Sequence, residues 1–336
     1  MPSRAHFGAL LISLHAKSFG KLIVNGKSVR GRPLSSLDFR SLEVYLAIYM
    51  SSLDMDILPL PGIPGSDLLI GLKEVLTELR SKTIGVPQVQ HYEIYFYWTN
   101  YANIRLENLL HRRDIDRLIS TPRHWAMAGM GPHMSGNVSE LVRIEISQRI
   151  SDFEKLIRSL EEKLSYWNYK QGQLVIPDTN IYLHSVLLFD EMDWSKILQA
   201  RLNDIHLVIP LLIIDELDNQ KRSNAKTDNE KFAVRTRARM TLKKISEIFF
   251  KPTLVHTLHF NDSNSGKVFV SLFMDNLAHE RLIDNDSEII DRACSLRDLT
   301  NREVTIVTFD VSMSLRAKNA GLNCVLLENE KQKQAD

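Results

Sequence analysis

Residues 173–178 read Gln-Leu-Val-Ile-Pro-Asp, a short apolar run that ends at an aspartate. Two later segments, 207–216 and 304–310, repeat this arrangement of an apolar run followed by a carboxylate, and a further apolar run covers 323–327. Short runs that are rich in β-branched and other apolar residues are typical of strands buried on both faces. The carboxyl half is therefore predicted to contain four buried strands, three of which end at acids.

Helical patterns separate these runs, at residues 194–202, 231–250, 287–297 and 312–319. Buried strands that alternate with amphipathic helices predict an α/β fold of three layers, with a parallel sheet between helices. Thr253–His259 and Lys267–Met274 flank a polar segment that contains a glycine, which predicts a hairpin or an edge extension of the sheet. We expect this domain to cover residues 173–328 and a polar tail to follow at 329–336.

The first 136 residues are expected to form an amino-terminal domain of unknown type that is mostly helical after residue 66. An apolar run that meets an Asn-Gly turn predicts a strand at 20–27. Ser66 is a suitable N-cap for a helix through about Arg80, and a second helix is expected from His91 to Leu110. Two prolines and three glycines predict a loop at 121–136.

A long connecting helix is predicted over residues 137–170, where Asn137 and Glu140 have the spacing of a capping box. Its apolar residues recur at alternating spacings of four and three over about three heptads. They are Ile146, Ile150, Phe153, Ile157, Leu160, Leu164 and Trp167. We interpret this seam as the core-facing side of a helix that joins the two halves, and the alternative is a coiled-coil homodimer.

The overall composition is that of an ordinary globular chain, with 336 residues, 44% hydrophobic residues, 25% charged residues and a net charge of +1. The near-zero net charge gives no global indication of nucleic-acid binding, so any such signal must be local. Cys294 and Cys324 lie far apart and lack the companions of a zinc site or a disulfide framework, which favours a cytoplasmic location. The apolar run Phe7–Leu14 is too short to cross a bilayer, so no membrane partner is expected.

Four acids follow the predicted strands or precede a predicted helix: Asp178, Glu216, Asp286 and Asp310. Asp178 and Asp310 follow strands directly, Glu216 lies where a strand gives way to a helix, and Asp286 lies just before a helix expected to begin near Glu288. The carboxyl ends of parallel strands open on one edge of a sheet, where ligands bind. We therefore expect the four side chains to meet, although each acid alone could be a helix cap or a loop residue.

A group of carboxylates this close together would repel one another unless some took up protons or bound a cation. Oxygen ligands without Cys or His favour Mg²⁺ or Mn²⁺. Such ions usually keep water and phosphate oxygens as ligands, which suits phosphodiester hydrolysis. Asp291 lies five residues after Asp286 and is the competing candidate for the third acid.

The chain also resembles the PIN domain family over about residues 173–328, and most closely the type that is fused to PhoH-like ATPases. The resemblance is carried by four segments: Val175–Asn180, Val208–Asp218, Asn285–Ile290 and Val307–Lys318. It implies a Mg²⁺- or Mn²⁺-dependent ribonuclease with metal ligands at Asp178, Glu216, Asp286 and Asp310. It further implies that Thr179, Asn180 and Thr308 are supporting polar residues. The chain has no phosphate-binding loop of the GxxxxGK[ST] type, so the ATPase is absent, and residues 1–136 resemble no family that we can name.

Residues 217–251 form a basic segment in which ten lysines and arginines stand against four acids, a local net charge of +6. It follows Glu216 directly, so its first part is expected to lie near the acids. Lysine and arginine contacts to phosphates supply affinity that does not depend on sequence. We expect Lys221, Arg222, Lys226 and Arg235 to contact nucleic acid, and the alternative is an ordinary solvated helix face.

These patterns favour a metal-dependent endoribonuclease that hydrolyses phosphodiester bonds at an acidic Mg²⁺ or Mn²⁺ site. The main alternative is a catalytically weak or inactive PIN fold that binds RNA or serves as a scaffold. A third class, an unrelated doubly wound α/β protein such as a phosphatase, has little support because GxSxG, GxGxxG and a DxD pair after the first strand are all missing.

Overall fold

The structure is a computed structural model, and the chain divides into a unit of residues 1–45 and a unit of residues 46–336. All residues described below lie in the second unit. They are residues 57–87, 90–130, 135–169, 172–200, 203–222, 233–249, 256–258, 266–275 and 279–328. The strand expected at 20–27, the apolar run 7–14, the tail 329–336 and Lys226 lie outside the described residues.

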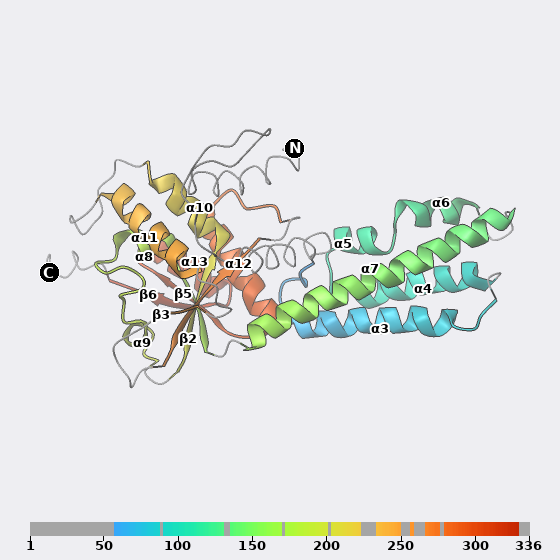
Figure 1. The fold of residues 1–336 in the computed structure, drawn as a ribbon, viewed down its shortest axis with the longest axis horizontal. Helices are drawn as coiled ribbons and strands as arrows, with labels where there is room; N and C mark the ends of the chain where they lie inside the picture. Colours follow the sequence, from blue (N-terminus) through green and yellow to red (C-terminus); the bar gives the residue numbers. More distant parts are fainter. Residues whose placement is uncertain are drawn as a thin grey trace, which may run out of the picture. The chain divides into compact units, whose positions relative to one another are not determined.

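The carboxyl half contains a six-stranded sheet (Figure 1), and its strands follow the order β3-β4-β2-β1-β5-β6. The strands are β1 (Gln173–Pro177), β2 (Ile205–Pro210), β3 (His256–Leu258), β4 (Val268–Phe273), β5 (Val304–Thr308) and β6 (Asn323–Leu326). All neighbouring strands are parallel except β3, which pairs with β4 in the antiparallel sense at one edge. This arrangement confirms the predicted α/β class and the edge hairpin.

The central strands owe their position to their apolar sequences. Every residue of β2 and β5 is buried, and only the first residue of β1 is partly exposed. Such strands need helices on both faces of the sheet. The helices that follow β1 are α8 (Thr179–His184), α9 (Trp194–Ile197), α10 (Leu211–Gln220), α11 (Val234–Phe249), α12 (Asn285–Thr300) and α13 (Val311–Asn319).

The elements of this half depart from the predicted boundaries in three places. The second strand ends at Pro210 and α10 begins at Leu211, so Glu216 lies within a helix and not where a strand gives way to one. The helix expected at 194–202 is the short α9, because its last turn stops at Ile197 and Gln199 has a positive φ of 53°. The helix expected near Glu288 begins at Asn285, with Asp284 as the N-cap. The side chain of Asp284 accepts hydrogen bonds from the backbone and hydroxyl of Ser287. Asp286 therefore lies inside the first helical turn and is not the cap.

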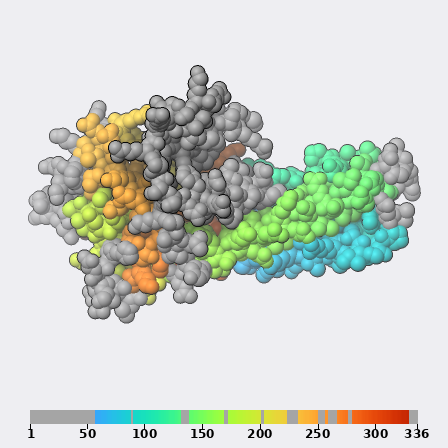
Figure 2. Space-filling view, in the orientation of Figure 1, coloured from blue at the N-terminus to red at the C-terminus, as the bar shows by residue number. Residues whose placement is uncertain are grey.

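The described part of the amino-terminal half is helical, as predicted. Its helices are α3 (Gly65–Thr83), α4 (His91–Leu106), α5 (Arg112–Leu118), α6 (Pro122–Met130) and α7 (Ser135–Tyr169). In Figure 2, α3 and α7 lie side by side, and their residues contact one another along the pair. None of the described helices is both long enough and apolar enough to cross a membrane.

Three details of the helical half were predicted wrongly. Ser66 is not the cap of α3, because the helix begins at Gly65 after Pro64 and Ser66 Oγ donates to Asp67 instead. The second helix ends at Leu106 rather than Leu110. The expected loop 121–136 contains α6, since Pro122 suits a first helical position and Thr121 Oγ1 accepts from the His124 N–H.

Helix α7 begins at Ser135, two residues before the predicted cap Asn137, and runs for 35 residues. Its apolar seam packs against α3 and α4 of the same chain, where Phe153 and Leu160 are buried, and Trp167 near its end is buried against the sheet. The seam is therefore occupied within the chain, which favours the interpretation of a core-facing connecting helix over a coiled coil.

The helical half and the sheet domain are joined by direct contacts between named groups. The Gly62 N–H donates to Asp298 Oδ2 at 2.8 Å, which links the chain before α3 to α12. Trp167, near the end of α7, contacts the rings of His206 on β2 and Phe273 on β4. Arg302 donates to the carbonyl of Trp167 at 3.2 Å. The sheet domain is thus tied to both α3 and α7.

Candidate acidic site

The edge of the sheet at the carboxyl ends of β1 and β5 carries two of the four acids. These strands are parallel neighbours, with Pro177 paired to Val307. Asp178 directly follows β1 and is the N-cap residue of α8, while Asp310 follows β5 and is the N-cap residue of α13. Glu216 lies on α10 after β2, the other neighbour of β1, and Asp286 lies on α12.

Asp178 is buried, with 2% of its surface exposed, and its side chain makes no capping hydrogen bond to α8. Its Oδ2 atom instead accepts from Thr308 Oγ1 at 2.9 Å and from Asn180 Nδ2 at 3.2 Å. The pKa of Asp178 is raised from 3.8 to about 6: burial raises it most, the Thr308 hydrogen bond lowers it, and the charges of Asp286 and Glu216 also raise it. A carboxylate that is not used as a cap is thus held inside the protein beside other acids.

Glu216 is fixed by residues from two other segments. Its carboxylate accepts from Thr179 Oγ1 on α8 and from Asn285 Nδ2 on α12, the latter at 2.5 Å. These bonds join α8, which follows β1, to α10, which follows β2, and α10 to α12, which precedes β5. Glu216 therefore has a defined orientation at the same edge as Asp178.

Asp286 and Asp310 complete the acidic edge. Burial raises the pKa of Asp286, the nearby charges of Asp284 and Asp310 raise it further, and Arg316 lowers it. Asp310 Oδ1 accepts from the Ser312 N–H at 2.7 Å, so Asp310 is a true helix cap. The Asp310 N–H donates to Thr308 Oγ1, whose hydroxyl donates to Asp178. Thr308 thereby links two of the acids.

The donor set of this edge fits a divalent cation. Its carboxylates offer oxygen alone, and a buried acid whose pKa is raised by burial and by its acidic neighbours lacks a compensating positive charge. Among the described residues, however, no three of the four carboxylates place one oxygen each within 4.8 Å of one another. Binding a shared cation would therefore draw these side chains closer together.

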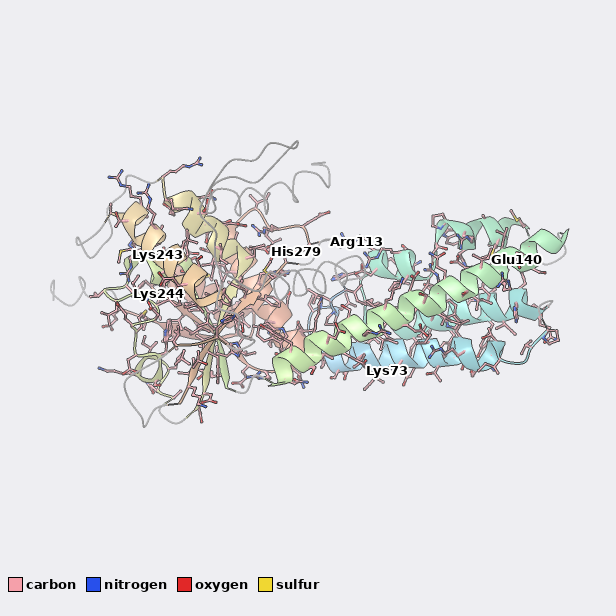
Figure 3. All side chains as sticks on the ribbon, viewed as in Figure 1. Lys73, Arg113, Glu140, Lys243, Lys244 and His279 are labelled. Carbon is pink, nitrogen blue, oxygen red and sulfur yellow. The ribbon has the colours of Figure 1, made fainter. Side chains whose placement is uncertain are left out.

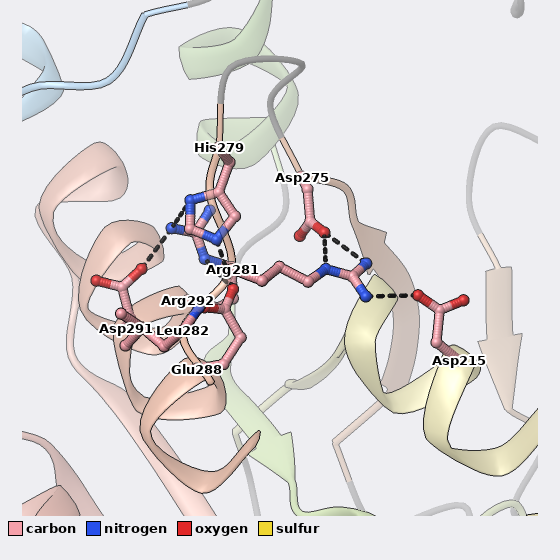
Figure 4. Close-up of polar contacts among 8 residues, drawn as sticks. All are labelled: Asp215, Asp275, His279, Arg281, Leu282, Glu288, Asp291 and Arg292. Atoms are coloured by element: carbon pink, nitrogen blue, oxygen red, sulfur yellow. Dashed lines mark hydrogen bonds and ion pairs between the residues drawn. The ribbon is translucent and has the colours of Figure 1, made fainter. Parts of the chain in front are cut away.

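A different cluster of possible ligands does satisfy that distance, and the positively charged side chain of an arginine lies within it. One ligand atom each from His279, Glu288 and Asp291 lie within 4.8 Å of one another. Arg292 lies among them, with Nη2 3.0 Å from His279 Nδ1, Nε 3.3 Å from Glu288 Oε1 and an ion pair to Asp291 (Figure 4). Asp291 is thus engaged away from the four acids, which favours Asp286 over Asp291 as the third acid.

The basic segment after Glu216 is less uniform than its sequence suggests. Lys221 forms an ion pair with Asp218, while Arg222 and Arg235 are exposed. Arg237 is buried and donates to the carbonyls of Tyr182 and Leu187, so it holds α11 against the chain after α8. Helical spacing alone could not identify this residue as structural.

The solvent side of α11 carries the remaining cations of the described part of this segment. Arg239 and Lys243 are exposed, four residues apart, in line with Arg235. Lys244 lies beside Lys243 and pairs with Asp190 at 3.0 Å (Figure 3). The helix packs on α8, which begins directly after Asp178, and on α10, which carries Glu216.

Three polar residues of this region were not singled out in the sequence analysis. Asn285 binds Glu216, Arg316 pairs with Asp284, and Arg281 bridges Asp275 and Asp215. Asn285 could have been singled out because it precedes Asp286 directly. Arg281 carries no pattern in the sequence, since its partners lie on two distant segments.

Comparison with known proteins agrees with this geometry at the level of the family. Residues 175–328 match the family model of the PIN domain, a fold whose members are generally nucleases and typically use divalent metals. The match supports a PIN-like fold for the sheet domain, and it does not distinguish the PhoH-like type from others. No curated protein matches the chain.

Among solved structures, one match is a domain of a functionally unknown protein from Methanocaldococcus jannaschii DSM 2661. It is 18% identical, and the alignment covers 47% of this chain and 92% of that domain, with a TM-score of 0.28.

Proposed function

We propose that the protein is a metal-dependent endoribonuclease that hydrolyses phosphodiester bonds at the edge formed by Asp178, Glu216, Asp286 and Asp310. The observation that carries the proposal is the buried carboxylate of Asp178, whose pKa of about 6 reflects burial and acidic neighbours. A protein that buries an acid in this way loses stability unless a cation binds there. The two free cysteines suit a cytoplasmic setting.

The four acids would hold Mg²⁺ or Mn²⁺, which supplies stabilisation of the negatively charged phosphoryl oxygens and lowers the pKa of water. The protein's own contribution is orientation. Thr308 and Asn180 fix Asp178, and Thr179 and Asn285 fix Glu216, so these carboxylates keep their positions before a substrate arrives.

The second candidate function is RNA binding or scaffolding without cleavage. It is favoured by the spacing of the acids, since no three of the four carboxylates converge within 4.8 Å among the described residues. The two functions differ in whether metal produces cleavage, because both predict binding of nucleic acid.

Purified protein is expected to cut labelled single-stranded RNA when Mn²⁺ or Mg²⁺ is added, and not in the presence of a chelator. Asp178→Asn and Asp310→Asn should each lower the rate by more than about 100-fold, since even groups that only support metal ligands contribute 10- to 100-fold. Asp67→Asn, an exposed aspartate of α3, is the control with the same chemical change.

The assay separates the alternatives. Metal-dependent cleavage that is lost in both site variants and kept in the control supports the nuclease. Binding of RNA without any metal-dependent cleavage would establish the second candidate function. Cleavage of DNA but not RNA would retain the chemistry and contradict the ribonuclease.

Binding of RNA is expected to depend on the exposed cations of α11. Reversing two charges in Arg235→Glu/Arg239→Glu should weaken binding at least about tenfold and reduce the slope of log affinity against log salt by about 1.4. The measurement is fluorescence anisotropy of labelled RNA, with a chelator present so that no cleavage occurs. Lys155→Glu/Arg158→Glu changes the charge of exposed α7 residues equally and serves as the control. Equal losses in both double variants would assign the effect to net charge rather than to α11.

A further inference from the structure

The chain that leads into α12 is held by more polar contacts than its exposure suggests. We call residues 279–284 the strap; they precede Asn285 directly and form neither helix nor strand. Leu282 and Ile283 expose their side chains to solvent. The strap is nevertheless tied to α12 by buried or partly buried groups and to α10 by the exposed Arg281, as Figure 4 shows.

The central group is Glu288, a carboxylate in the first turn of α12 with no exposed surface. Its Oε1 atom lies 2.6 Å from His279 Nε2, and its Oε2 atom accepts from the Leu282 N–H at 2.8 Å. Both oxygens therefore bind the strap. Burying an acid so completely is unfavourable unless it is paired and hydrogen-bonded, and here it is both.

The hydrogen bonds of His279 fix its proton. Arg292, 3% exposed, places Nη2 3.0 Å from His279 Nδ1 and Nε 3.3 Å from Glu288 Oε1. A guanidinium can only donate, so His279 Nδ1 must accept and the ring proton lies on Nε2, facing Glu288. The three side chains form one connected network, in which Arg292 supplies the positive charge that a metal would otherwise provide.

The strap also reaches α10. Arg281 donates to Asp215 Oδ2 at 2.7 Å and to Asp275 Oδ2 at 2.7 Å. Asp215 is the direct neighbour of Glu216, and Asn285, one residue beyond the strap, binds Glu216 itself. The strap thus contacts two of the acid-bearing helices next to their acids.

We propose that Glu288, through His279 and the Leu282 N–H, is a positioning residue that fixes the strap and thereby the placement of Asp286 and Asn285 at the acidic edge. This inference rests on the proposed function of that edge. Residues two apart on a helix point about 200° from each other, so Asp286 and Glu288 serve opposite sides of α12. Loosening Glu288 frees the first turn of α12, and the bond from Asn285 to Glu216 is lost with it.

The test compares Glu288→Gln and His279→Ala with His279→Gln, which keeps a donor for Glu288 and an acceptor for Arg292. Glu303→Gln is the control, since Glu303 is exposed at the opposite end of β5 and accepts from Asn323 at 3.0 Å. One measurement is the affinity for Mn²⁺ alone, by electron paramagnetic resonance of the free ion. The other is amide hydrogen exchange of the metal-free protein.

Glu288→Gln and His279→Ala should weaken Mn²⁺ binding by about 10- to 100-fold, as expected for groups that orient metal ligands. Exchange should accelerate over residues 279–288 and stay unchanged in β1 and β5. His279→Gln and Glu303→Gln should keep most of the affinity of the wild type. His279 lies in the strap rather than in the helical core, so its variant keeps the test valid if Glu288→Gln fails to fold.

Two results would overturn the proposal: faster exchange without weaker Mn²⁺ binding, which makes the network purely structural, or variants that match Glu303→Gln in both measurements. Failure of the proposed function looks different. It appears as wild-type protein that binds no Mn²⁺, before any variant is compared, and it would remove the positioning role as well.

Discussion

Replacing Asp178 by asparagine is expected to stabilise the metal-free protein at neutral pH and to abolish its stabilisation by Mn²⁺. Asp178 is 2% exposed, and burial beside Asp286 and Glu216 raises its pKa to about 6. The charged form is therefore disfavoured in the folded state. Asparagine is neutral and nearly the same shape, and its carbonyl can still accept from Thr308.

The sign of the pH dependence follows from this pKa. Between about pH 4 and pH 6 the folded protein binds a proton at Asp178 that the unfolded chain has released, so stability falls as the pH rises through this window. A rise from 3.8 to about 6 corresponds to about 3 kcal/mol at neutral pH. The advantage of Asp178→Asn should be absent at pH 4 and complete at pH 7.

Urea unfolding at pH 4 and pH 7, with and without Mn²⁺, measures both effects. Wild-type protein should gain about 2.7 kcal/mol at a metal concentration 100 times the dissociation constant, and the variant should gain nothing. Asp67→Asn again provides the matched control. A variant that is less stable than wild type at pH 7 without metal would contradict the account of Asp178 as a strained buried acid.

Replacing Gly172 by alanine is expected to cause a large loss of stability, because both its backbone conformation and its surroundings oppose a side chain. Gly172 lies between α7 and β1 with a φ of 112°, where residues with a side chain are strained. A Cβ there would lie 2.5 Å from the Asp204 carbonyl oxygen, which the adjacent strands hold in place. Strain and steric overlap together should lower the free energy of unfolding by about 3 kcal/mol or more.

Gly85→Ala isolates the backbone strain from the steric overlap. Gly85 has a φ of 72°, yet nothing lies within 4 Å of its would-be Cβ. We expect that variant to lose about 1 kcal/mol, as a left-handed conformation alone requires. Denaturant midpoints of the two variants would be compared with wild type. Equal losses would show that the backbone around Asp204 yields to the extra methyl group.

The sheet domain was predictable because its strands are encoded locally. The runs at β1, β2 and β5 are mostly apolar and buried, and Asp178 and Asp310 follow β1 and β5 where parallel strands end. The run at β6 also forms a strand, but it is an edge strand that is only partly buried, not the fully buried strand that we predicted. The placement of Asp178 and Asp310 at one edge of the sheet thus followed from the sequence and the handedness of the connections. That the strands before them, β1 and β5, are direct neighbours did not. The pairing of β4 with β2 could not be predicted from the sequence, because pairing between distant strands leaves no local pattern.

Helix α6 was missed although its signal is local: the prolines and glycines of residues 121–136 outweighed the cap at Thr121. The other misses depend on contacts between distant residues. Arg237 looks like any surface cation, and only its carbonyl partners at Tyr182 and Leu187 make it structural. The contacts of the strap could not be predicted for the same reason, since the partners of Arg281 lie on separate segments.

The packing of helix α7 has a consequence for how the protein unfolds. Its middle lies in the core of the helical half, while Trp167 near its end packs on β2 and β4 and is capped by Arg302. Neither half can melt without exposing apolar surface of the other. The described helices and the sheet should therefore unfold in a single calorimetric transition. A destabilising substitution in the helices far from the sheet should lower the fraction of molecules with a folded acidic edge, without changing the geometry of that edge.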